Sequence, residues 1–102
     1  MQTIQLYADP DYYVNVVLEG QVYFLRFVWN SEAEFWAMNI EDFARNHLLA
    51  VKLLPNRRLI SRYTVTGLPR GDFVIISDSR TIARTDFQDG YATLVYVSES
   101  EL

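Results

Sequence analysis

The chain has 102 residues, of which half are hydrophobic and 15% are aromatic, so a single domain with a sizeable core is expected. It contains no cysteine, which excludes a disulfide framework, a thiolate zinc site and a cysteine nucleophile. The net charge of −4 argues against a nucleic-acid binder that works by neutralising phosphates.

The first residues, MQTIQLYADP, lack the basic start and the long apolar run of a signal peptide. Uninterrupted apolar stretches elsewhere are only a few residues long, far short of the about 20 residues that span a bilayer. We therefore expect a soluble protein with no membrane partner. The same N-terminal segment contains a short strand candidate, with Ile4 and Leu6 on one side, that ends at Asp9-Pro10.

Residues 12–30 have the pattern of a β-hairpin. Glu19-Gly20 supplies a two-residue turn in which Gly20 can adopt a positive φ, so Leu18 pairs with Gln21 and opposed residues share a face. One face is continuously apolar and is predicted to lie in the core: Tyr12, Val14, Val16, Tyr23, Leu25, Phe27 and Trp29. The other face is too apolar for an ordinary solvated surface, and we expect the rest of a sandwich or another subunit to cover it: Tyr13, Asn15, Val17, Val22, Phe24, Arg26 and Val28.

Two interpretations fit residues 34–53 equally well. Ser31 and Glu34 have the spacing of a capping box, and a helix from about residue 33 to 53 would carry one apolar face. Alternation of Trp36, Met38 and Ile40 with smaller or polar residues instead predicts a strand, a turn over residues 42–46 and a second strand over residues 48–53. Periodicity alone leaves both open.

The rest of the chain contains two further strand candidates. Residues 57–63 form a basic, partly apolar connection, and residues 68–72 form a turn cluster. The run FVIIS at 73–77 is typical of a buried strand, residues 78–89 of a long surface loop, and the alternating run YATLVYV at 91–97 of a last strand. The pattern predicts an all-β fold, a small single-domain antiparallel sandwich or partly open barrel of six to seven strands. The domain spans residues 1–102, with a short flexible acidic tail at 98–102.

No reactive site emerges from these patterns. His47 is the only histidine and has no partner for a triad or a metal site, the thirteen carboxylates are scattered, nearly all of them over predicted turns, and the four glycines are isolated. We therefore predict no catalytic, cofactor-binding or metal-binding residues and no enzymatic activity. One basic cluster with an adjacent aromatic side chain supplies the candidate partner contacts: Arg57, Arg58, Arg62 and Tyr63. The alternative is a small β-barrel that binds single-stranded nucleic acid through this Arg/Tyr groove, which the acidic total disfavours.

The order of several short segments resembles the baseplate plug family, small tail proteins of contractile-tailed phages and prophages. The likeness covers nearly the whole chain and is carried by six landmarks in sequence: residues 4–7, 26–30, 35–40, 53–56, the pair 68–73 and 86–87, and 94–97. The resemblance favours two strands over residues 34–53. It departs at residues 43–46, where Phe-Ala-Arg-Asn stands in place of an expected glycine-containing turn.

The resemblance implies a function that side-chain chemistry does not reveal. It implies a non-enzymatic structural component of a phage or prophage tail baseplate that packs against hub and tube proteins and helps to close the tube. Such a protein is assembled in the host cytoplasm and ends in the virion tail. Its implied partners are tail tube and hub proteins, with a homo-oligomer as a further form of association.

Overall fold

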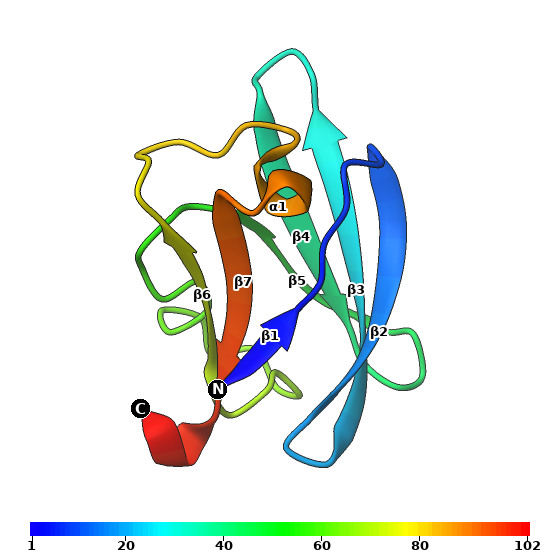
Figure 1. Ribbon diagram of the computed structural model, residues 1–102. Coiled ribbons are helices and arrows are strands. Elements are labelled where there is room, and N and C mark those ends of the chain that lie inside the picture. Colours follow the sequence, from blue (N-terminus) through cyan, green and yellow to red (C-terminus); the bar gives the residue numbers. More distant parts are fainter.

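Seven strands form two antiparallel sheets in the computed structural model, which describes residues 1–102. The small sheet has the order β1-β7-β6 and the large sheet the order β2-β3-β4-β5, and the two sheets face each other as two layers (Figure 1). The predicted all-β sandwich is confirmed, and neither sheet closes into a barrel. The strands are β1 (Gln2–Ile4), β2 (Asp11–Leu18), β3 (Gln21–Asn30), β4 (Phe35–Glu41), β5 (His47–Lys52), β6 (Asp72–Ser77) and β7 (Ala92–Val97).

The β2–β3 hairpin has the register that the sequence predicts. Leu18 lies opposite Gln21 and Tyr12 lies opposite Phe27. Glu19 and Gly20 both have positive φ, 50° and 81°, which is the type I′ geometry that suits the twist of a two-residue hairpin. The predicted core face points toward the small sheet, where Leu25 and Phe27 are fully buried.

Residues 34–53 form two strands, and the helical interpretation is wrong. Trp36, Met38 and Ile40 are all buried, as the strand pattern requires, whereas Phe43 in the intervening turn is 73% exposed. A helix would have placed Phe43 on its apolar face. Ahead of β4, the side chain of Asn30 accepts hydrogen bonds from the amides of residues 32 and 33, so this segment forms a turn and starts no helix.

The connection between β5 and β6 protects one edge of the small sheet. The Asn56 amide donates to the Ile75 carbonyl at 2.7 Å, and the Leu59 amide donates to the Phe73 carbonyl at 3.1 Å. Residues 56–59 therefore lie along the outer edge of β6 and satisfy part of its backbone, as an additional strand would. This short extended piece fixes where the arginines on either side of Leu59 lie.

The segment after β6 is more ordered than the surface loop that the sequence predicts. It contains the short helix α1 (Asp86–Asp89), which covers the upper end of the sandwich in Figure 1. Ile82 and Phe87 are buried against the core, and the Arg84 carbonyl accepts a hydrogen bond from Nε1 of Trp36 at 3.3 Å. Two apolar residues in a polar segment were enough to fold it onto the sheets.

The acidic tail forms a 3-10 turn over Glu99–Glu101, and the flexibility expected for residues 98–102 stays a prediction. Both chain ends lie close together at the lower end of Figure 1, beside the tip of the β2–β3 hairpin. No helix in the structure has the length and apolar character needed to cross a membrane.

Candidate interaction surfaces

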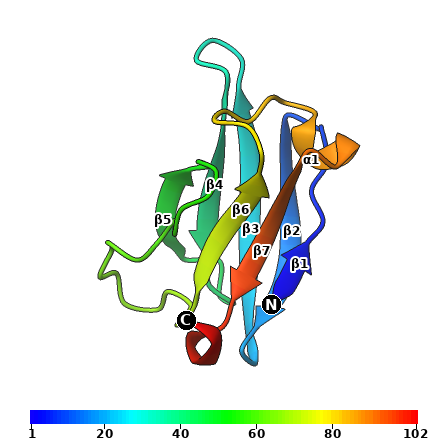
Figure 2. The same ribbon diagram turned by 60° about the vertical axis from the view of Figure 1, so that its left-hand side comes forward.

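The outer face of the large sheet is the first candidate surface. The small sheet packs on the opposite side of the large sheet, so no further sheet or helix of the chain lies over this outer face (Figure 2). Tyr13, Val17 and Val22 are 45%, 55% and 42% exposed, and Phe24 and Val28 are half-buried. The rest of the sandwich therefore does not cover this face, and its cover by another subunit stays a prediction.

Arg45 lies over the part of this face that contains Tyr13 and Phe24. It occupies the turn position where a glycine is expected, with φ 68°, because Asp42 holds the turn by accepting hydrogen bonds from the amides of residues 44 and 46. The guanidinium carbon of Arg45 lies 4.7 Å from the centre of the Tyr13 ring and 4.4 Å from that of Phe24. The arginine thus shields two aromatic side chains and leaves Val17 and Val22 open.

Glu41 holds this arginine in place. Its carboxylate accepts hydrogen bonds from Nε of Arg45 at 2.8 Å and from the Tyr13 hydroxyl at 3.0 Å. The hydrogen bond from Arg45 lowers the pKa of Glu41 below its ordinary value, burial opposes this shift, and the Tyr13 hydroxyl adds to it. Glu41 is 9% exposed, so its charge depends on these partners.

Replacing Arg45 with alanine tests this contact. We expect the pKa of Glu41 to rise toward its ordinary value and the protein to lose a small amount of stability at neutral pH. Because the folded-state pKa is the lowered one, the stability that Glu41 contributes is present above its unfolded pKa of about 4.3 and is lost as pH falls through the folded value. An NMR titration of the Glu41 carboxyl measures the pKa, and an unchanged midpoint would show that Arg45 does not hold this charge.

The predicted partner contacts lie on the connection that follows β5. Arg57, Arg58, Arg62 and Tyr63 are all exposed. Arg58 and Tyr63 line the same shallow hollow together with Arg70, whereas Arg57 and Arg62 lie outside its lining. Arg58 also forms an ion pair with Asp72, its Nε lying 3.0 Å from the carboxylate, while Arg57 and Arg62 form no ion pair.

Asp72 fixes the geometry of this basic connection. Its side chain is fully buried, and one carboxylate oxygen accepts hydrogen bonds from the amides of Leu59, Ile60 and Phe73 at 2.8–3.0 Å. The other oxygen receives the Arg58 guanidinium. A buried carboxylate with this many donors is a structural anchor, and it holds the arginines on the outside of β6.

Basic residues are concentrated in one part of the chain, and no sequence motif marks this concentration. Residues 43–71 contain six of the nine Lys and Arg residues and no Asp or Glu. Arg70, which the sequence patterns above do not single out, belongs to this basic stretch and forms no ion pair. We call residues 57–70, with Arg57, Arg58, Arg62 and Arg70, the basic segment. A count of charges along the sequence would have found all four arginines.

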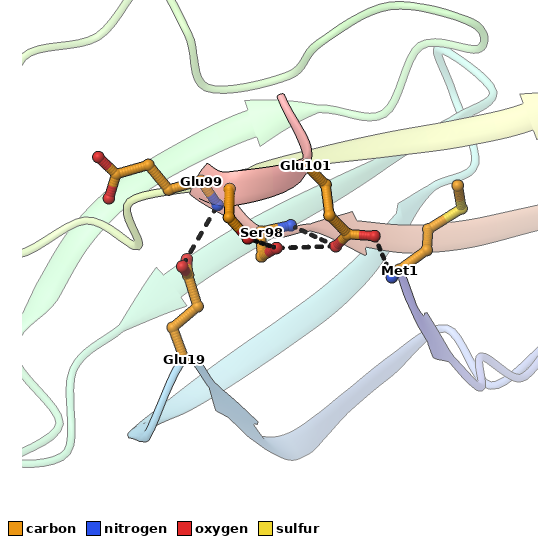
Figure 3. Close-up of polar contacts among 6 residues, drawn as sticks. Met1, Glu19, Ser98, Glu99 and Glu101 are labelled. Carbon is orange, nitrogen blue, oxygen red and sulfur yellow. Dashed lines mark hydrogen bonds and ion pairs between the residues drawn. The ribbon is translucent and has the colours of Figure 1, made fainter.

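An acidic corner lies at the end of the sandwich that holds the tip of the β2–β3 hairpin, across a hollow from Arg70. It consists of Glu19 at the hairpin tip and Glu99 and Glu101 in the C-terminal turn (Figure 3). Glu19 accepts hydrogen bonds from the Tyr96 hydroxyl at 2.5 Å and from the Glu99 amide at 3.3 Å, and burial raises the pKa of Tyr96. Glu101 accepts from the Met1 amine and from Ser98. The Glu99 carboxylate points away from the others and has no partner.

A large hollow lies at the other end of the sandwich, between β4 and the segment after β6. It measures about 670 Å³ and is lined by Trp29 and Phe35 together with Lys52, Arg80 and Arg84, against one carboxylate, Glu34. Lys52 lies over the Phe35 ring at 4.9 Å, and Arg84 donates to the Ala8 carbonyl. Two of the three cations are therefore engaged within the chain.

His47 lies at a strand end, as the sequence predicts, whereas two of the carboxylates expected in turns, Glu41 and Asp72, lie buried in strands. His47 is exposed at the start of β5, where its ring lies 3.4 Å from the Asn39 side chain. No three His, Asp or Glu side chains gather into a group that could hold a metal ion. The nucleic-acid alternative gains no support, because the sheets form no barrel, Arg58 is held by Asp72, and Tyr63 is the only aromatic residue of the basic segment.

The two-sheet fold and these surfaces define a small β-sandwich whose prominent exterior features are apolar and charged contact faces. A family model described as "Cyanophage baseplate Pam3 plug gp18" matches residues 1–99, and the chain belongs to this phage baseplate plug family. No curated protein matches the chain significantly. Family membership implies a structural role in a phage baseplate, a location in the virion tail and association with other tail proteins.

Proposed function

We propose that the protein is a non-enzymatic plug component that packs against hub and tube proteins of a phage or prophage tail and helps to close the tube. Family membership over residues 1–99 carries the proposal. The protein would be assembled into the tail in the host cytoplasm. A plug needs a rigid domain with contact faces, and the sandwich provides one.

The outer face of the large sheet supports contacts with tube or hub proteins. Val17 and Val22 lie opposite each other near the hairpin tip and are both about half exposed. Exposed apolar side chains on a sheet surface are the type of group that the more apolar, fully buried centre of a protein interface contains. The basic segment offers a second contact surface through Arg57, Arg58, Arg62 and Tyr63.

Co-expression with the adjacent tail proteins, followed by affinity capture, tests the proposal. We expect the wild-type chain to capture at least one hub or tube protein, and a Val17→Lys, Val22→Lys double variant to lose that capture. Because both side chains are exposed, the double variant should keep the wild-type fold and nearly the wild-type melting temperature.

A matched control replaces an exposed apolar residue elsewhere. Ile76 is 52% exposed on the outer side of β6, so Ile76→Lys adds one charge to the other sheet. Capture should survive this change. Loss of capture in the control, or capture of no tail protein by the wild-type chain, would contradict the proposed role of the outer face.

A further inference from the structure

Arg70 of the basic segment and the acidic corner carry opposite charges at one end of the sandwich. The two lie on either side of one hollow of about 560 Å³, which Glu19 lines from the hairpin tip and Arg70 from the basic segment. Figures 1 and 2 show the C-terminal turn at this same end. A surface with adjacent positive and negative patches complements a second copy of itself when the two copies are related by a two-fold axis.

We infer that the basic segment of one copy binds the acidic corner of a second copy, so that two chains pair end to end about a two-fold axis. The pairing rests on the proposed function, because it names the partner of the same basic segment. Each copy places its arginines on the partner's carboxylates, and the contact therefore forms twice. Tyr63 and Val65, each 39% exposed, lie beside Arg62 and add apolar area to the contact.

Three observations support a second copy as the occupant. Arg57, Arg62 and Arg70 have no carboxylate partner within their own chain. The Glu99 carboxylate, at the other half of the contact, also has none and points outward (Figure 3). The basic stretch contains no carboxylate that would repel an acidic partner, although the whole chain has a net charge of −4. One molecule therefore presents three arginines without an ion-pair partner in the basic segment and one carboxylate without a partner, that of Glu99, in the acidic corner.

Sedimentation of the purified full chain tests the pairing. At an ionic strength of about 0.05 M we expect a species with twice the 11.9 kDa mass of the chain, and at about 0.5 M the single-chain mass, because salt screens exposed charges. Arg62→Glu and Glu99→Arg should each weaken the pairing by about ten-fold or more, since each change occurs twice in the pair. Arg80→Glu alters an exposed arginine at the other end by the same charge and should leave the pairing unchanged.

Mixing the two charge-reversed variants gives the decisive result. Arg62→Glu chains and Glu99→Arg chains should form mixed pairs, because the reversed charges again face opposite signs and the second contact keeps its native charges. A single-chain mass for the wild type at low ionic strength, no restoration in the mixture, or an equal loss with Arg80→Glu would each overturn the inference.

The capture experiment above separates this inference from the proposed function. Capture of hub or tube proteins by a wild-type chain that stays single at low ionic strength would remove the pairing and keep the plug function. A chain that pairs but captures no tail protein would keep the pairing and remove the plug function.

Discussion

Replacing Asp72 with alanine is expected to lower the free energy of unfolding by about 3–5 kcal/mol, because buried amides around its carboxylate would lose an acceptor at a cost of about 1–3 kcal/mol each. The carboxylate is fully buried and accepts hydrogen bonds from three amides and from Arg58. Without it, the amides of residues 60 and 73 lose this acceptor in a site that water does not reach, and the amide of residue 59 keeps only the Phe73 carbonyl. Chemical denaturation at neutral pH measures the loss.

Three further variants show which contacts of Asp72 matter. Asp72→Asn keeps an oxygen for the amides but turns a donor toward Arg58, so its loss should lie between those of wild type and Asp72→Ala. Arg58→Ala should cost less than about 1 kcal/mol, because the Arg58 side chain is 52% exposed and water can replace it. Asp78→Ala removes an exposed carboxylate just beyond β6 and should be neutral.

The order of these losses identifies the anchor. If Arg58→Ala destabilised the protein as much as Asp72→Ala, the ion pair rather than the three amide hydrogen bonds would hold the basic segment. The positions of the arginines in the basic segment depend on the same anchor, because these side chains extend from the backbone that Asp72 fixes.

Local patterns in the sequence predict the strands well because strand pairing here follows short turns. Glu19-Gly20 specifies a two-residue hairpin, and that turn alone sets the register of all eight residue pairs between β2 and β3. The same patterns predict the excess apolar character of the outer face. Local patterns do not decide the structure of residues 34–53, because the same apolar residues fit both a strand and a helix. Only the family resemblance favours the strands that the structure shows.

The surfaces depend on contacts that no local pattern encodes. Arg45 reaches Tyr13 only because the turn after β4 brings it back over β2, 32 residues earlier in the chain. Asp72 meets Leu59 and Ile60 across a loop, and Glu19 meets Glu99 across 80 residues of chain. The arginines of the basic segment are recognisable from their charges, but their anchor and their acidic counterpart require the folded chain.

Gly71→Ala is the second substitution with a large expected effect. Gly71 lies where the chain enters β6 and passes close to the end of β7. A Cβ atom at this position would lie 2.0 Å from the Val97 carbonyl oxygen and 2.7 Å from the Tyr96 hydroxyl. The first neighbour is backbone and cannot rotate away, so β6 and β7 must separate locally. We expect a loss of about 3 kcal/mol, at the upper end for overpacking.

The effect of Gly71→Ala should spread to the acidic corner. The Gly71 amide donates to the Tyr96 hydroxyl at 2.7 Å, and that hydroxyl donates to Glu19. Displacing Gly71 therefore disturbs the bond that ties the hairpin tip to β7. Amide hydrogen exchange should show faster exchange at the Glu99 amide, which donates to Glu19, in addition to the global loss of stability.

A double variant separates the two close contacts. Tyr96→Phe removes the hydroxyl oxygen but leaves the Val97 carbonyl in place, so Gly71→Ala should remain strongly destabilising in that background. If Tyr96→Phe instead made Gly71→Ala harmless, the hydroxyl and not the backbone of β7 would be what excludes a side chain. If Gly71→Ala stays strongly destabilising beside Tyr96→Phe, then β6 and β7 approach too closely at this position for any side chain. This close approach is the physical reason for the glycine in the turn before β6.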